Sequence, residues 1–331
     1  MKNYFLAFTL AATISATAQH KTLAGFAYGN SVAPTGDEWQ SPENLSLNKE
    51  YPRAYFFSFN NEKQATQVLP EYSPYWQSLN GQWRFHWCKN PDQRPKDFYK
   101  TDYDTSKWDA IPVPSNWNVY GIQKDGSLKY GLPIYVNQPV IFYHERKVDD
   151  WRKGVMRTPP TDWTTYEYRN EVGSYVREFE VPNNWEGREI FIDFDGVDSF
   201  FYLWINGKYV GFSKNSRNVA SFDITHYLQK GKNKVAVEVY RNSDGSFLES
   251  QDMFRLPGIF RTVALRATPK VQIFNLNILT DTDYKTWDLQ VKAEVRNLTN
   301  QPVEGYSLRY AVYPAKHLYK DEVTETPEKQ W

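Results

Sequence analysis

The chain has almost no cysteine and no excess of charge of either sign. Cys88 is the one cysteine among 331 residues, which excludes an internal disulfide and a cysteine-rich metal site. We expect Cys88 to be a buried, small hydrophobic residue. Lysine plus arginine and aspartate plus glutamate both number 39, so the formal net charge is zero. Nucleic-acid-binding proteins usually carry a basic excess, and we therefore expect no nucleic-acid partner.

Long apolar runs are absent as well. The longest run near the N-terminus covers residues 4–12, whereas a membrane-spanning helix needs about 20 apolar residues, so we expect no membrane span. The run follows Lys2 and precedes Ala16-Thr17-Ala18, a small-x-small pattern typical of signal-peptide cleavage. We predict that residues 1–18 are a signal peptide. The protein would then be exported, to the periplasm or the medium, and the lack of disulfides favours a bacterial periplasm.

Aromatic residues are abundant, at 17% of the chain. Aromatic side chains fill the cores of β-sandwiches, and they also stack on the apolar faces of sugar rings. The core interpretation accounts for most of them, and the sugar-binding interpretation stays open for a few.

The clearest structural pattern lies between residues 173 and 266. Short apolar stretches alternate with polar residues at the period of a strand, and they recur roughly every 8–15 residues with almost no helical periodicity. Asn206-Gly207 separates two of these stretches and predicts a tight hairpin, because both turn residues need positive φ. The pattern predicts an all-β antiparallel sandwich, and about eight strands suit a jelly roll.

The character of the sequence divides the chain into further segments. Residues 19–75 are rich in Asn, Ser, Pro and Glu and are interpreted as an N-terminal arm, and residues 76–268 as the jelly roll. Residues 269–331 carry three alternating stretches that match the start of an immunoglobulin-like sandwich. Such a domain needs about 100 residues and seven strands. We therefore expect this domain to be incomplete and the chain to be part of a longer protein.

One segment carries a specific resemblance. Residues 243–261, which read SDGSFLESQDMFRLPGIFR, closely resemble the signature of bacterial β-galactosidases of glycoside hydrolase family 2. The other matching segments follow in the family's order, and together they cover roughly residues 39–266; they are residues 78–85, 113–117 with 133–137, and 195–207.

The resemblance implies an architecture and an activity. Family members have a jelly roll, an immunoglobulin-like domain and a (β/α)8 barrel, and they hydrolyse terminal non-reducing β-D-galactose residues in β-galactosides. A retaining mechanism needs two carboxyl groups, which in this family are glutamates of the barrel. No residue here matches either glutamate, so we name no catalytic residue and predict that the chain alone is inactive. A Mg²⁺ ion is expected only in the barrel.

The resemblance also implies a substrate-binding role for two residues. Asp252 matches the aspartate that binds galactose hydroxyls and helps ligate a monovalent cation, usually Na⁺, and Asn137 matches an asparagine that binds the same sugar. The local sequence also allows a solvated loop acid at Asp252 and a turn residue at Asn137. Glu249 is interpreted as a loop or interface residue, and Arg255 as a partner of one of the two acids.

Alternatives remain open at this point. A jelly roll can be a stand-alone carbohydrate-binding module, and related members of the family act on β-glucuronides or β-mannosides. Residues 140–172 form a longer stretch than the corresponding loop of well-known members, and it either borders the sugar site or is a surface insertion. The resemblance implies a homo-oligomer for the parent protein, and the natural galactoside is not indicated.

Overall fold

The computed structural model describes residues 8–11, 26–30, 32–136, 170–249, 252–299 and 301–310. The chain divides into two compact units. The larger unit comprises Lys21–Pro52 and Gln77–Ala267, and the smaller unit comprises Met1–His20, Arg53–Trp76 and Thr268–Trp331. The stretch 19–75, interpreted from the sequence as one arm, is thus divided between the two units.

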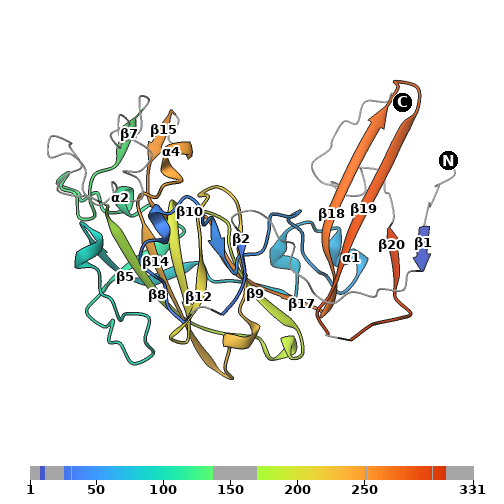
Figure 1. Ribbon diagram of the computed structural model, residues 1–331, viewed down its shortest axis with the longest axis horizontal. Helices are drawn as coiled ribbons and strands as arrows, with labels where there is room; N and C mark the ends of the chain where they lie inside the picture. The colour runs from blue at the N-terminus through green and yellow to red at the C-terminus, as the bar shows by residue number, and fades with distance from the viewer. Residues whose placement is uncertain are drawn as a thin grey trace. The chain divides into compact units, whose positions relative to one another are not determined.

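The larger unit is built on two sheets, whose strands are labelled in Figure 1. The eight-stranded sheet has the order β2 (Phe26–Ala27), β3 (Ser46–Leu47), β12 (Lys208–Ser213), β11 (Phe200–Ile205), β14 (Lys232–Tyr240), β8 (Val172–Glu180), β5 (Gly81–Cys88), β6 (Asp109–Val113). In this order, β2 and β3 pair in parallel, and all neighbours from β12 to β6 pair antiparallel. The four-stranded sheet has the order β13 (Ala220–Asp223), β9 (Glu189–Phe194), β17 (Val263–Thr268), β4 (Trp76–Ser78).

Two small ribbons complete the strands of this unit. One pairs β7 (Ile134–Val136) with β15 (Met253–Arg255), and the other pairs β10 (Val197–Asp198) with β16 (Gly258–Ile259). The unit has more strands than the eight or so expected, because its shortest strands, of two or three residues, are too short to show alternation.

Helices are few and short, which confirms the all-β class. No helix in the described residues is long and apolar enough to cross a membrane. In the part of the chain that the structure describes, the helices are α1 (Glu62–Ala65), α2 (Trp117–Tyr120) and α4 (Ser246–Glu249). The single 3₁₀ turns there are η1 (Glu38–Gln40), η2 (Pro70–Tyr72), η3 (Pro91–Gln93), η4 (Asn183–Trp185) and η5 (Thr225–Tyr227).

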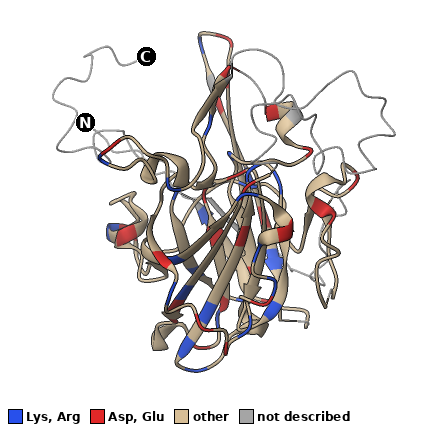
Figure 2. Cartoon of the chain, turned by 90° about the vertical axis from the view of Figure 1, so that its left-hand side faces the viewer, with Lys and Arg blue, Asp and Glu red and all other residues tan. Residues whose placement is uncertain are grey.

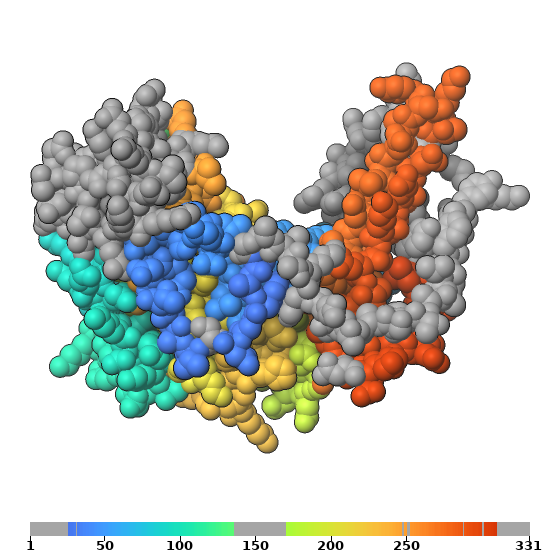
Figure 3. Space-filling view, in the orientation of Figure 1, coloured from blue at the N-terminus to red at the C-terminus, as the bar shows by residue number. Residues whose placement is uncertain are grey.

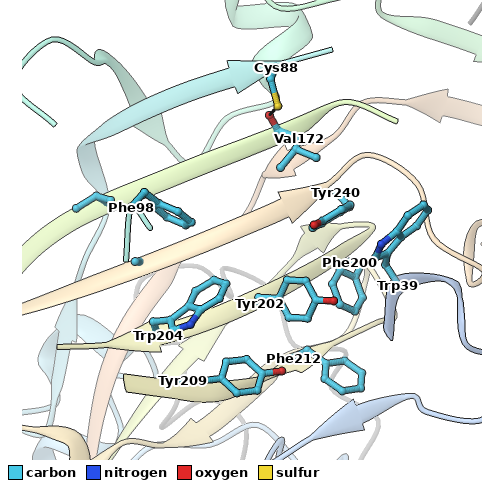
Figure 4. Packing of buried hydrophobic residues seen from close by; sticks show 12 residues of the cluster. Trp39, Cys88, Phe98, Val172, Phe200, Tyr202, Trp204, Tyr209, Phe212 and Tyr240 are labelled. Atoms are coloured by element: carbon cyan, nitrogen blue, oxygen red, sulfur yellow. Dashed lines mark hydrogen bonds between the residues drawn. The ribbon is translucent and has the colours of Figure 1, made fainter. Parts of the chain in front are cut away.

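Strand β11 is buried on both faces, which explains its unbroken apolar sequence. On one face Phe201 packs against Phe194 of β9 and Phe222 of β13, at ring-centroid distances of 4.9 and 5.9 Å, and so joins the two sheets into a sandwich. The other face belongs to the aromatic cluster in Figure 4. Its buried members are Trp39, Cys88, Phe98, Val172, Val176, Phe200, Tyr202, Trp204, Tyr209, Phe212, Ala236 and Tyr240.

The segment around η1 is an integral part of this cluster. Trp39 is completely buried and stacks on Tyr240, with ring centroids 5.4 Å apart, and its indole nitrogen donates to the carbonyl oxygen of Gly36. Figure 3 shows the N-terminal part of the larger unit, in blue, on the surface beside the yellow strands. Cys88 is buried as predicted, and burial, as the largest cause, raises the pKa of its thiol to about 12.

The hairpin predicted at Asn206-Gly207 is confirmed. These residues join β11 to β12 with φ angles of 51° and 80°, the left-handed region that favours glycine and asparagine. Farther along β12, Gly211 lies against the main chain of β3. A Cβ atom on Gly211 would stand 2.1 Å from the carbonyl oxygen of Leu47, so only glycine fits there.

In the smaller unit, β18 (Val271–Thr282) and β19 (Trp287–Asn297) form a long antiparallel hairpin. β20 (Ser307–Tyr310) pairs with β1 (Phe8–Ala11). The strands β18, β19 and β20 correspond to the three stretches from which the sequence predicted the start of an immunoglobulin-like domain. β1 lies within residues 1–18, and the signal peptide there stays a prediction.

Candidate functional site

The β7–β15 ribbon carries the predicted site. Its register pairs Met253 with Val136, Phe254 with Tyr135 and Arg255 with Ile134. The ribbon thereby joins two of the sequence segments that carry the resemblance, residues 133–137 and 243–261, which are about a hundred residues apart along the chain. Figure 1 shows β7, β15 and α4 at one end of the larger unit.

Asp252 immediately precedes β15 and is exposed. The hydroxyl group of Tyr135 donates a hydrogen bond to Oδ1 of Asp252. This hydrogen bond is the largest cause that raises the pKa of Tyr135 above its ordinary value. A carboxylate has about four acceptor positions, so Asp252 can accept further bonds from sugar hydroxyl groups while Tyr135 fixes its orientation.

Tyr135 and Phe254 also form an exposed aromatic pair. Their ring centroids are 5.2 Å apart at an interplanar angle of 49°, and the residues are 52% and 62% exposed. The sequence marked position 135 only as part of the PIYVN segment, and gave no sign that its hydroxyl group would contact Asp252. Carboxylate and aromatic faces on one ribbon offer polar and apolar contacts to a sugar ring.

Glu249 anchors the chain on the N-terminal side of Asp252. Its carboxylate accepts hydrogen bonds from the backbone nitrogen and the Oγ of Ser216, at 2.8 and 2.6 Å. Arg255 contacts Glu249 through the main chain, since its Nη1 donates to the carbonyl oxygen of Glu249 at 2.8 Å. Glu249 is therefore the last residue of α4 rather than a loop residue, and its carboxylate anchors this helix to Ser216.

The carboxylate of Asp198, whose side chain is 16% exposed, lies near the same ribbon. Burial raises the pKa of Asp198 to about 6, while Arg217, whose Nη1 lies 3.5 Å from Oδ2, acts in the opposite direction. Nη2 of Arg217 also donates to Sδ of Met253, the first residue of β15. The sequence did not indicate this network, because its members Asp198, Arg217 and Met253 come from three separate segments.

Asn137 and residues 140–169 of the predicted insertion lie outside the described residues, so their predicted roles stay predictions. For a sodium ion, Asp252 supplies a suitable ligand, since hard cations prefer oxygen. No group of three or more His, Cys, Asp or Glu side chains that could hold a metal occurs in the described part of the chain. Asp252 is the one residue that the resemblance assigns to the sodium site, and this assignment stays a prediction.

Charged residues of both signs are spread along the chain. Figure 2 shows basic and acidic residues intermingled over the strands and loops, in line with the balanced composition.

The site thus consists of an exposed carboxylate beside two exposed aromatic rings on an all-β sandwich. Residues 76–269 match the family described as "Glycosyl hydrolases family 2, sugar binding domain". The chain belongs to glycoside hydrolase family 2, and the region that matches is that family's sugar-binding domain.

Relatives of this chain are β-galactosidases. It is 38% identical over 293 residues to a β-galactosidase of Priestia megaterium, covering 88% of this chain and 26% of that protein. It is 41% identical over 208 residues to a β-galactosidase of Halalkalibacterium halodurans, covering 62% of this chain and 18% of that protein. A solved β-glucuronidase of Bacteroides uniformis matches with a TM-score of 0.49 at 20% identity, covering 72% of this chain and 26% of that one. The chain thus spans about a quarter or less of the length of these relatives.

Proposed function

We propose that this chain is the sugar-binding part of a longer β-galactosidase, which hydrolyses terminal non-reducing β-D-galactose residues in β-galactosides. The observation that carries the proposal is the family match over residues 76–269, together with relatives named β-galactosidase at 38–41% identity. The reaction would be retaining and would use two glutamates outside this chain.

In this proposal the exposed carboxylate of Asp252 binds galactose. Charged acceptors make hydrogen bonds roughly twice as strong as neutral ones, and a carboxylate can accept two sugar hydroxyl groups. Its hydrogen bond from Tyr135 supports the role, because the hydroxyl group restricts the side chain to one orientation. Asn137 follows Val136 in the sequence and is proposed to bind the same sugar through its amide.

Three further points belong to the proposal. A Na⁺ ion bound in part by Asp252 would supply electrostatic attraction for sugar oxygens. The N-terminal pattern of Lys2, the apolar run and Ala16-Thr17-Ala18 supports export. The parent enzyme would be a homo-oligomer. N-terminal sequencing of the periplasmic protein tests export, and light scattering of the full-length protein tests the oligomeric state.

The substrate is tested with the full-length product of the reading frame that contains this chain. We expect hydrolysis of an aryl β-D-galactoside in clear preference to the corresponding β-D-glucuronide and β-D-mannoside. Preference for either of the other two would overturn the galactoside assignment within the same family. The 331-residue chain alone should show no turnover, and measurable turnover by it would contradict the assignment of the chemistry to another part of the protein.

A reading frame that stops after Trp331 would instead support a stand-alone binding module. In that case the chain should still bind galactose, and a titration followed by NMR would detect this binding without any catalysis.

A further inference from the structure

A completely buried carboxylate lies beneath the β7–β15 ribbon. Glu171 precedes β8 and Arg241 follows β14, and the two strands pair with Val172 opposite Tyr240. Glu171 and Arg241 therefore continue the same ladder, and the backbone nitrogen of Arg241 donates to the carbonyl oxygen of Glu171 at 2.9 Å. The side chains are 0% and 4% exposed.

Glu171 is surrounded by hydrogen-bond donors. Nη1 of Arg241 donates to Oε1 at 2.6 Å. Oε2 faces the indole nitrogens of Trp87 and Trp117 at 3.3 and 3.2 Å, and the amide of Asn118 at 3.3 Å. A buried charge is tolerated only when it is paired and hydrogen-bonded, and these four donors meet that requirement.

The other side of the Arg241 guanidinium contacts the ribbon. Nη2 donates to the carbonyl oxygen of Leu132 at 2.9 Å and to that of Arg255 at 3.4 Å. Leu132 comes two residues before β7, and Arg255 is the last residue of β15. One planar group thus holds the base of both strands of the ribbon, whose other end carries Asp252 and its bond from Tyr135.

The approach of this segment to Glu171 requires a glycine. Gly131 has a φ of 77°, and a Cβ atom there would stand 2.4 Å from Oε1 of Glu171. Buried ion pairs contribute little net stability compared with apolar residues of similar volume. The directed geometry of the arginine fork, which a point charge such as lysine lacks, is a more specific contribution.

We propose that the Glu171–Arg241 pair is a positioning device that fixes the base of the β7–β15 ribbon and thereby holds Asp252 and Tyr135 in register for the sugar. Glu171 and Arg241 are positioning residues that do not themselves contact the ligand. The inference rests on the proposed function only for the identity of the ligand, because the register of the ribbon can be measured without any sugar.

The readout is amide hydrogen exchange in the β7–β15 ribbon of the 331-residue chain, followed by NMR at constant pH. The reporting amides are those of the paired segments 134–136 and 253–255. We expect Arg241→Lys, which keeps the positive charge but lacks the fork, to speed the exchange of these amides by about tenfold or more, relative to the amides of β11 and β14 in the same molecule.

The matched control is Arg266→Lys. Arg266 forms a second buried ion pair, with Asp193, in which the two side chains are 6% and 2% exposed. This control should lower the melting temperature but leave the exchange of the ribbon amides unchanged.

Three outcomes overturn the proposal. The first is a folded Arg241→Lys chain whose ribbon amides exchange as in the wild type. If Arg241→Lys does not fold, Glu171→Gln receives the same measurement, and unchanged exchange there is the second. The third is loss of folding in both variants, with Arg266→Lys folded, because the pair would then support the whole sandwich. Failure of galactose to bind, with the expected changes in exchange observed, would count against the proposed function only.

Discussion

Replacement of Trp39 by alanine tests whether residues 32–52 are part of the core of the larger unit. A tryptophan side chain buries about 200 Å², which at about 25 cal/mol per Å² corresponds to an upper limit near 5 kcal/mol. Large-to-small changes of buried aromatic residues cost about 3–5 kcal/mol. Trp39 is completely buried and stacked on Tyr240, so we expect Trp39→Ala to destabilise the chain by this amount.

Thermal unfolding followed by circular dichroism measures the effect. For a unit of this size each kcal/mol changes the melting temperature by about 2–4 °C, so the expected loss is about 6–20 °C. Trp39→Phe keeps a ring against Tyr240 and should lower the melting temperature less than Trp39→Ala does. The control is Leu45→Ala, whose side chain lies in the same segment but is 44% exposed. A loss below about 1 kcal/mol for Trp39→Ala would show that the segment is a peripheral arm.

The remaining predictions also concern stability. Gly211→Ala should cost about 1–3 kcal/mol through the clash with Leu47, and more than Gly207→Ala, whose cost is about 1 kcal/mol from its positive φ alone; equal melting temperatures would refute the close approach. Asp198 has an ordinary pKa of 3.8 and a folded pKa of about 6, so its charge destabilises the fold above about pH 6 and this cost disappears as the pH falls toward 4. Asp198→Asn should therefore raise stability at pH 8, by at most about 3 kcal/mol, and change it little at pH 4. Asp125→Asn should instead lower stability at pH 8 and change it less at low pH, because hydrogen bonds from Ser127 lower the pKa of Asp125 and stabilise its charged form. The same pH dependence of stability for both variants would contradict both assignments.

Local patterns predicted the parts of the fold that depend on neighbours in sequence. The turn at Asn206-Gly207 was predictable because its φ angles require those residue types, and the strands of the smaller unit were predictable from their period of two. The burial of Trp39 in the core was not predictable, because the strands on either side of it, β2 and β3, are only two residues long and show no alternation. The stacking of Trp39 on Tyr240 also joins residues some two hundred positions apart.

The candidate site was likewise only partly predictable from the sequence. The resemblance indicated Asp252 and the segment that contains Tyr135. It could not indicate the hydrogen bond between them, which depends on the register of β15 against β7. Glu171 and Arg241 carry no motif in the sequence, and only the pairing of β8 with β14 makes them neighbours.

The central claim is that the Asp252 carboxylate binds the sugar on which the longer enzyme acts. Measurement of kcat/KM for an aryl β-D-galactoside with Asp252→Asn in that enzyme tests it most directly. The control is Asp288→Asn, at an exposed position of β19. Loss of a charged contact of about 2–4 kcal/mol predicts a fall of about 30- to 800-fold for Asp252→Asn and almost none for the control. Wild-type kcat/KM in a correctly folded Asp252→Asn enzyme would contradict the account.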